Sequence, residues 1–194
     1  MSVICVNADE VPPQPWRNGG GTTRELLCWP DATSWSARVS LADVASDGPF
    51  SAYPGISRWF AVIEGAGVML RFGRVTHWLE MEEEPFRFDG AAAPACQLID
   101  GPTRDLNLML RDGQGLMCDV APGVNWRARF SLRGLFTTGS GRWLSHDGGE
   151  GSERRLTAHT LLWSDSHASA VWRFEPDDPL TRAWWMGFTP RGLA

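Results

Sequence analysis

The run from Trp16 to Glu25, Trp-Arg-Asn-Gly-Gly-Gly-Thr-Thr-Arg-Glu, concentrates groups that can bind a small polar anion. Three consecutive glycines allow positive φ angles and let the backbone come close to a ligand or to another segment. A turn needs only one or two glycines beside an Asn or Asp, although a purely structural role stays open. The run predicts ligand contacts from Trp16, Arg17, Asn18, Gly20, Gly21, Thr22, Thr23 and Glu25.

Nucleotide binding does not fit this run. A phosphate-binding P-loop needs a lysine, and all 18 basic residues of the chain are arginine. The dinucleotide fingerprint spaces its glycines between a strand and a helix, whereas these glycines are consecutive and the segment after them soon reaches Pro30. The net charge of −5 also disfavours nucleic acid as a partner, because binding to phosphates needs a basic face.

The bulk composition is that of a globular protein. At 194 residues the chain can form one large domain or two small ones. Its four cysteines are far apart in apolar segments, so we expect free thiols and no disulfides. Without a signal peptide or an apolar run near 18 residues, the sequence predicts a soluble cytoplasmic protein and no membrane partner. Most of the eleven tryptophans should fill a core.

Alternation of apolar and polar residues dominates the chain and predicts an all-β protein. The predicted strands are 35–41, 59–63, 68–72, 96–99, 106–110, 168–174 and 184–188, with Gly/Pro turns between them. Such spacing is typical of a sandwich or a barrel. The best helix candidate, 157–163, is weak, and 140–152 is predicted to be a polar, glycine-rich loop. The acidic run 80–84 is predicted to be a solvated hairpin edge.

Two segments resemble the motifs of the cupin fold. The block from Asp47 to Gly67 has the rhythm of the first motif, and the segment from Asp100 to Asn107 resembles the second. In metal-binding cupins a His-x-His pair, a Glu and a later His bind one metal ion. Here the His pair is replaced by Arg58 and Phe60, and the later His by Asp105.

A cupin metal centre is therefore not expected. Arginine stays protonated and has no lone pair to give to a metal. The four histidines, at positions 77, 146, 159 and 167, have no compact ligand spacing. His77 should lie on a strand edge, and the other three should lie in polar segments. We expect no metal and no other cofactor.

With these motifs in view, the chain resembles the HutD/Ves family of metal-free, two-cupin proteins. The resemblance rests on Pro15 to Glu25, on Trp35 to Ala42 and on the block that ends in Arg58. It implies a bicupin of two jelly-roll-like barrels packed together, with an N-terminal half at 1–112 and a C-terminal half at 113–194. Terminal strands could be exchanged between the halves. It also implies a regulatory, non-catalytic role in bacterial histidine utilisation, with urocanate or a formylglutamate-like intermediate as the ligand.

Arg58 is the centre of the predicted site. A buried, unpaired charge costs several kcal/mol, so the guanidinium needs a partner. Asp105 or Glu25 could be that partner, or a ligand carboxylate could take two parallel hydrogen bonds from it. Trp59 or Phe60 could stack on a planar ring. Asn107 either contacts the ligand or satisfies the strand-edge backbone.

Three functions remain open from the sequence. The first is a sensor or sequestering protein for a carboxylate of histidine breakdown. The second is a metal-independent enzyme that uses Glu25 and Asp105 for acid–base chemistry. The third is a protein-interaction module with a vestigial pocket, for which a homodimer is a possible assembly.

Overall fold

The structure, a computed structural model, describes residues 3–147, 150–165 and 171–192. It contains two compact units. The N-terminal unit comprises Val11–Asp112, and the C-terminal unit comprises Gly113–Ala194 together with Met1–Glu10. The first ten residues, expected in the N-terminal half, therefore belong to the other unit, because β1 (Ile4–Asn7) pairs with β16 (Thr160–Ser164).

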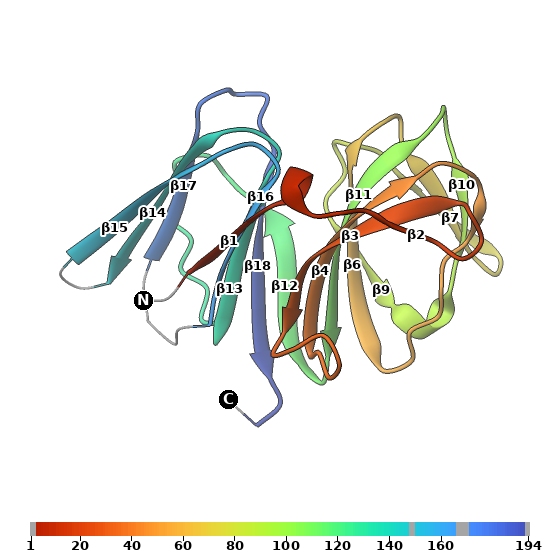
Figure 1. The fold of residues 1–194 in the computed structure, drawn as a ribbon, viewed down its shortest axis with the longest axis horizontal. Coiled ribbons are helices and arrows are strands. Elements are labelled where there is room, and N and C mark those ends of the chain that lie inside the picture. The colour runs from red at the N-terminus through yellow and green to blue at the C-terminus, as the bar shows by residue number, and fades with distance from the viewer. Residues whose placement is uncertain (1–2, 148–149, 166–170, 193–194) are drawn as a thin grey trace. The chain divides into compact units, whose positions relative to one another are not determined.

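The N-terminal unit contains two antiparallel sheets (Figure 1). The first is six-stranded, in the order β2-β3-β4-β11-β6-β9, and is formed by β2 (Gln14–Pro15), β3 (Gly21–Trp29), β4 (Ala37–Val44), β6 (Ile56–Glu64), β9 (Phe86–Asp89) and β11 (Thr103–Arg111). The second is four-stranded, in the order β5-β10-β7-β8, and is formed by β5 (Gly48–Pro49), β7 (Val68–Phe72), β8 (Val75–Leu79) and β10 (Ala95–Leu98). A short 3₁₀ helix, η2 (Gly90–Ala92), precedes β10.

The C-terminal unit is built in the same way. Its five-stranded sheet, β1-β16-β13-β18-β12, adds β12 (Gly113–Asp119), β13 (Leu132–Thr137) and β18 (Ala183–Pro190) to β1 and β16. Its three-stranded sheet, β15-β14-β17, is formed by β14 (Gly141–Asp147), β15 (Glu150–Leu156) and β17 (Val171–Pro176). The 3₁₀ helix η1 (Ala8–Glu10) follows β1.

Each unit buries its own core between its two sheets. In the N-terminal unit, Phe60 and Val62 of β6 pack with Leu70, Leu79 and Cys96 from the four-stranded sheet. In the C-terminal unit the corresponding cluster is rich in tryptophan and contains Trp143, Trp172 and Trp185, with Trp126 packed against it. The alternation of apolar residues therefore serves two sandwich-like interiors.

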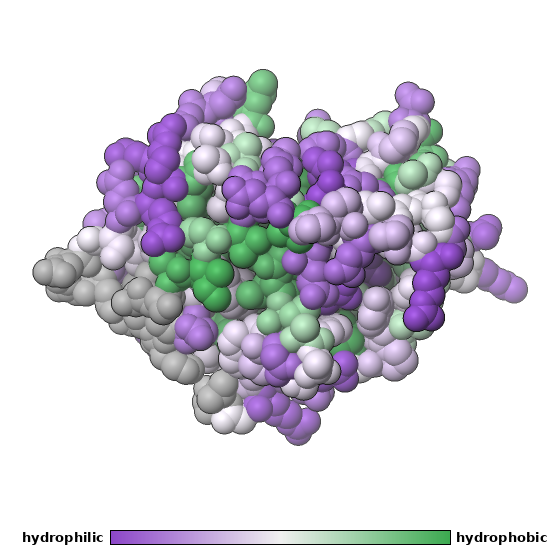
Figure 2. Space-filling view, viewed as in Figure 1, coloured by the Kyte–Doolittle hydropathy of each residue, from purple (hydrophilic) through white to green (hydrophobic). Residues whose placement is uncertain are grey.

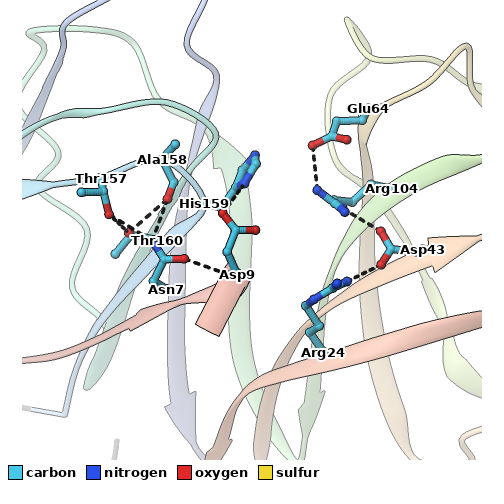
Figure 3. A network of polar contacts seen from close by, with 10 residues as sticks. All are labelled: Asn7, Asp9, Arg24, Asp43, Glu64, Arg104, Thr157, Ala158, His159 and Thr160. Atoms are coloured by element: carbon cyan, nitrogen blue, oxygen red, sulfur yellow. Dashed lines mark hydrogen bonds and ion pairs between the residues drawn. The ribbon is translucent and has the colours of Figure 1, made fainter. Parts of the chain in front are cut away.

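The outer surface is mainly hydrophilic in the view of Figure 2, with a hydrophobic area over β1 and neighbouring strands of the C-terminal unit. Ile4 of β1 is 52% exposed. Side-chain contacts hold the N-terminal segment in this unit (Figure 3). Asn7 Nδ2 donates to Thr157 Oγ1 at 3.0 Å, and Asp9 pairs with His159 at 3.2 Å.

The all-β prediction is confirmed, and 68–72 is found as predicted. Most other predicted strands begin or end within a few residues of the observed ones, and 168–170 lie outside the described residues. The weak helix candidate at 157–163 is not a helix, because this segment contains most of β16. All five residues of β16 are buried, so both faces of the strand are covered and its apolar run does not alternate.

The loop predicted at 140–152 is also wrong in large part. It contains β14 and the start of β15, with 148–149 outside the described residues. Its polar composition reflects the edge position of β15, whose outer side faces solvent. No helix in the described ranges is long and apolar enough to cross a membrane.

Candidate functional site

A cavity of about 640 Å³ lies in the N-terminal unit, against one face of the six-stranded sheet. Its strand-borne wall is formed by residues of β3, β4, β6 and β11, namely Thr23, Arg38, Ser40, Ala42, Arg58, Asn107 and Met109. The rest comes from β2, β5 and the adjoining loops, namely Gln14, Pro15, Trp16, Arg17, Asn18, Pro49, Phe50, Ser51 and Tyr53. Polar and aromatic side chains therefore line one cavity that is partly open to solvent.

Strand register explains why these residues share a face. Arg58 of β6 lies opposite Met109 of β11, and Met109 lies opposite Arg38 of β4. Asn107, two residues along β11, lies opposite Ser40. Since side chains alternate between the faces of a strand, residues two apart project into the same space.

Arg58 is the most buried cation of this wall, with 8% of its surface exposed. Its Nε and Nη2 donate to Asn107 Oδ1 at 2.9 and 2.6 Å. Its Cζ lies 4.6 Å from the ring centroid of Phe50 and 5.4 Å from that of Phe88. Burial lowers the pKa of Arg58 to about 10, which leaves the guanidinium charged at neutral pH. The side chain is thus held between two rings by a neutral amide.

Of the partners left open for Arg58, the two internal acids Asp105 and Glu25 make other contacts. Glu25 Oε2 lies 2.9 Å from Arg38 Nε. Asp105 accepts a hydrogen bond from Thr103 Oγ1 at 3.0 Å. Across the described ranges, neither acid hydrogen-bonds Arg58. Asp105 projects from the same face of β11 as Asn107 but lies further along the strand, so the register gives the contact to Asn107.

Asp105 is fully buried close to this cavity without lining it. It has 0% exposure, and its Oδ1 has no hydrogen-bond partner among the described residues. Burial raises the pKa of Asp105 to about 8, although the hydrogen bond from Thr103 and the charge of Arg58 oppose this shift. The carboxyl is therefore mainly protonated at neutral pH and does not neutralise Arg58.

The run at 16–25 is divided between the cavity and the scaffold. Trp16, Arg17, Asn18 and Thr23 lie in the cavity wall. Trp16 Nε1 donates to Thr23 Oγ1 at 2.7 Å, and this hydrogen bond fixes the indole beside the first residues of β3. Asn18 Oδ1 accepts from the backbone N–H of Gly20 at 3.1 Å. Four of the predicted contacts thus face the cavity.

The glycines have a packing role. Gly20 and Gly21 are not part of the wall. A Cβ on Gly21 would lie 2.3 Å from the carbonyl oxygen of Asp43, so only glycine allows β3 to pass β4 this closely. The carbonyl of Gly20 accepts from Ala45 N at 2.9 Å. Gly20 and Gly21 therefore contribute to the site by positioning the wall residues next to them, Asn18 and Thr23.

Thr22 projects to the opposite face of the sheet, where it donates to Asp43 Oδ2 at 3.3 Å. Asp43 also pairs with Arg24 and with Arg104, whose Nε lies 2.6 Å from Asp43 Oδ1 (Figure 3). Arg104 continues to Glu64 at 3.0 Å. Thr22 therefore belongs to a network that braces β3, β4, β11 and β6 on the side away from the cavity.

The aromatic residues expected to stack on a ligand do not line the cavity. Phe60 lies behind Phe50, with a centroid distance of 5.6 Å, and Trp59 packs under Arg87. Phe50 and Tyr53 lie in the wall instead. Both residues belong to the turn segment that precedes β6. They could have been predicted if this segment had been considered as part of the cavity wall.

Arg38 and Ser40 were also missed as site residues. The signal was available, because both are polar positions of the alternating stretch 35–41. Alternation shows that they share a face, but it does not show whether that face meets solvent or a cavity.

The wall does not suit a metal ion. Among the residues that line the cavity there is no His, Cys, Asp or Glu, and the buried cation Arg58 would repel a metal ion. Within the described parts of the chain, no three His, Cys, Asp or Glu residues are close enough to share a metal ion. His77 packs against Phe72 and Phe86 on the edge strand β8, His146 lies in β14, and His167 lies outside the described residues.

Several solved structures share this fold. HutD from Pseudomonas fluorescens SBW25, in a formate condition, has a TM-score of 0.84 and 26% identity, covering 98% of this chain and 100% of that chain. A conserved protein of unknown function from Pseudomonas aeruginosa PAO1 has a TM-score of 0.86 at 26% identity, covering 97% and 100%. Bacillus subtilis oxalate decarboxylase has a TM-score of 0.67 at 10% identity, covering 100% and 79%, which shows the fold alone.

Curated relatives match the chain over about half of its length and of their own. Protein Ves of Citrobacter koseri is 40% identical over 105 residues, which are 53% of this chain and 54% of the relative. An uncharacterized 21.2 kDa protein in the hutC 3′ region of Pseudomonas putida is 32% identical over 108 residues, 54% and 56% of the two chains. The model of the HutD family matches residues 8–180. The chain therefore belongs to the HutD family.

Proposed function

We propose that the N-terminal unit binds a small carboxylate from histidine breakdown, of the urocanate or formylglutamate type, and that the protein senses or sequesters it. The observation that carries this proposal is the state of Arg58. Its guanidinium is buried against the cavity, and the two hydrogen bonds it makes both go to the neutral Asn107. A buried cation held by a neutral amide favours an anion as its further partner.

The rest of the wall supports a planar organic anion. Phe50, Tyr53 and Trp16 offer aromatic surface, while Ser40, Ser51 and Thr23 offer hydroxyl groups. Arg17 and Arg38 add positive charge at other points of the wall. An extended molecule with a second polar group can therefore be bound at both ends, which suits an unsaturated or dicarboxylic acid better than acetate.

The composition of the wall supports binding over turnover. Its ionisable residues are Arg17, Arg38, Arg58 and Tyr53, and it contains no Asp, Glu or His. Glu25 and Asp105, the acids considered for acid–base catalysis, lie outside the wall, and Glu25 is paired with Arg38. We therefore favour a binding protein, and the hutC-region relative supports a link to histidine utilisation.

Isothermal titration calorimetry with urocanate, N-formylglutamate and histidine tests this proposal. We expect micromolar affinity for at least one of the two carboxylic acid intermediates. Arg58→Met keeps the apolar stem between Phe50 and Phe88 but removes the charge, and it should weaken binding by about 100-fold.

The matched control is Arg87→Met. Arg87 also lies against an aromatic ring, with its Cζ 5.0 Å from the centroid of Trp59, but it is outside the cavity wall. The affinity of the Arg87→Met variant for the ligand should equal that of the wild type. Unchanged binding by Arg58→Met would overturn the site, and no binding of any of the three compounds would overturn the ligand class.

A further inference from the structure

Strand β8 forms an open edge of the four-stranded sheet. Its one strand partner in the described part of the chain is β7, so one side of its backbone has no neighbouring strand. Two large apolar side chains lie on this strand in water, with Val75 55% and Trp78 59% exposed. An exposed edge with apolar side chains is a surface on which another strand can pair.

The geometry of the β7–β8 hairpin shows which backbone groups are available. Phe72 lies opposite Val75 across a two-residue turn, in which Gly73 has a φ of +61°. In such a hairpin the closing pair is hydrogen-bonded, and the pairs then alternate. The N–H and C=O groups of Thr76 and Trp78 therefore point away from β7, toward the open edge.

The two ends of β8 carry opposite charges. Arg74 precedes the strand and Glu80 follows it, and both are exposed. Antiparallel pairing of β8 with a second β8, centred on His77, places Arg74 of each copy opposite Glu80 of the other. The same register places Thr76 opposite Trp78, so the free backbone groups of both copies face each other.

We propose that β8 is a dimerisation edge, at which two copies of this chain join their four-stranded sheets through antiparallel β8 strands. The pairing is isologous, since the same patch serves both copies about one two-fold axis. Val75 then faces Leu79 of the second copy, and the two Trp78 side chains are diagonal neighbours on one face, within reach of each other. This inference does not depend on the proposed ligand.

The association should be reversible. A contact built on one five-residue strand and its flanking side chains is at the small end of specific interfaces. We therefore expect a monomer–dimer equilibrium in the micromolar range, which sedimentation velocity can follow from about 1 to 300 µM.

Charge reversal gives a decisive test. Arg74→Glu and Glu80→Arg each turn two attractive pairs of the homodimer into two repulsive ones, so each should weaken dimerisation by about 10-fold or more. An equimolar mixture of the two variants restores opposite charges at both pairs, and so does the double variant. Both should dimerise like the wild type. Arg71→Glu, on the neighbouring strand β7, is the matched control and should leave dimerisation unchanged.

Thr76→Pro tests the backbone contact. Its N–H points outward in the monomer, so a proline there removes a donor of the dimer without breaking the β7–β8 ladder. It should abolish dimerisation while the thermal melting curve keeps its cooperative shape. A wild type that is monomeric at 300 µM, a dimer insensitive to these variants, or a mixture that stays monomeric would each overturn the proposal.

Discussion

The two units each bury an arginine against an aromatic ring, yet only one of these arginines lines the cavity. Arg58 lies between Phe50 and Phe88 and borders open space. Arg133 is 1% exposed, with its Cζ 4.6 Å from the ring centroid of Trp172, and further contacts hold it. A buried arginine on an aromatic ring is therefore not in itself a binding site.

The side chains around each arginine make the difference. Near Arg58 the sheet contributes Ser40 and Ala42, which are small and leave room for a ligand. In the C-terminal unit the interior is filled by indoles, with Trp126 stacked on Trp185 at 5.0 Å and Trp143 edge-on to Trp172 at 5.1 Å. The same architecture thus holds a cavity in one unit and a packed tryptophan core in the other.

Truncation of a core tryptophan should cause the largest loss in the free energy of unfolding and should distinguish the packed core from the cavity. Trp172→Ala removes a fully buried side chain and should lower the free energy of unfolding by about 3–5 kcal/mol. Tyr53→Ala, in the cavity wall, should cost about 1 kcal/mol or less because its side chain already borders space. Urea denaturation measures both. Equal losses would contradict the division between packed core and cavity.

Removal of the charge of each arginine should also affect the stability of the two units differently. Arg133→Met removes a fully buried guanidinium from the ring of Trp172 in a packed core and should cost about 2 kcal/mol of stability. Arg58→Met should change stability by less than about 1 kcal/mol, because water in the cavity can solvate Asn107. Denaturation of both variants provides the comparison. A larger loss for Arg58→Met would assign that arginine a structural role.

Asp105 should make stability depend on pH. Its pKa is raised by burial to about 8 in the folded protein, above the ordinary value of 3.8. The folded state therefore holds a proton that the unfolded state releases, so this group contributes stability at low pH that is lost as pH rises from about 4 through 8. The slope for one proton is at most about 1.4 kcal/mol per pH unit.

Asp105→Asn tests this directly, because the amide keeps the shape of the carboxyl without its titration. Its free energy of unfolding, measured from pH 5 to 8, should fall less steeply than that of the wild type. Parallel profiles for the two proteins would show that Asp105 titrates normally.

Asn107→Asp should have the smallest effect, on affinity. The new carboxylate would accept the same hydrogen bonds from Arg58 but would neutralise its charge, and binding of a carboxylate ligand should weaken by about 10-fold. Calorimetry measures the change. An affinity equal to that of the wild type would mean that the charge of Arg58 does not attract the ligand.

Much of the fold could be predicted because alternation is a local signal. Stretches such as 35–41 and 68–72 alternate since one face is buried and the other is not. Segment 157–163 could be considered for a helix because β16 is covered on both faces, so its apolar pattern indicates burial and not the type of element. The loop prediction at 140–152 failed for the converse reason. The polar hairpin of β14 and β15 has a solvated edge, and such an edge resembles a loop in composition.

The site could be predicted only in part. Arg58 and Asn107 were singled out through the resemblance to the cupin motifs, and the start of the glycine run was singled out by residue type; all of them line the cavity. Arg38, Phe50 and Tyr53 were missed, because their presence in the wall depends on which strands are neighbours. The pairing of Arg58 with Asn107 in place of Asp105 depends on a difference of two residues in position along β11.

By itself, the sequence determined the all-β class, the exclusion of nucleotide and metal motifs, and the presence of a cation at a position where related folds place metal ligands. The first two follow from residue chemistry and local periodicity, which any short segment carries, and the third follows from the resemblance to the cupin motifs. Only the tertiary structure decided which face of each strand meets the cavity, which partner holds Arg58, and that Gly21 serves the passage of β3 along β4. Those features depend on contacts between residues far apart in the chain, and hydrogen-bond register between strands sets them.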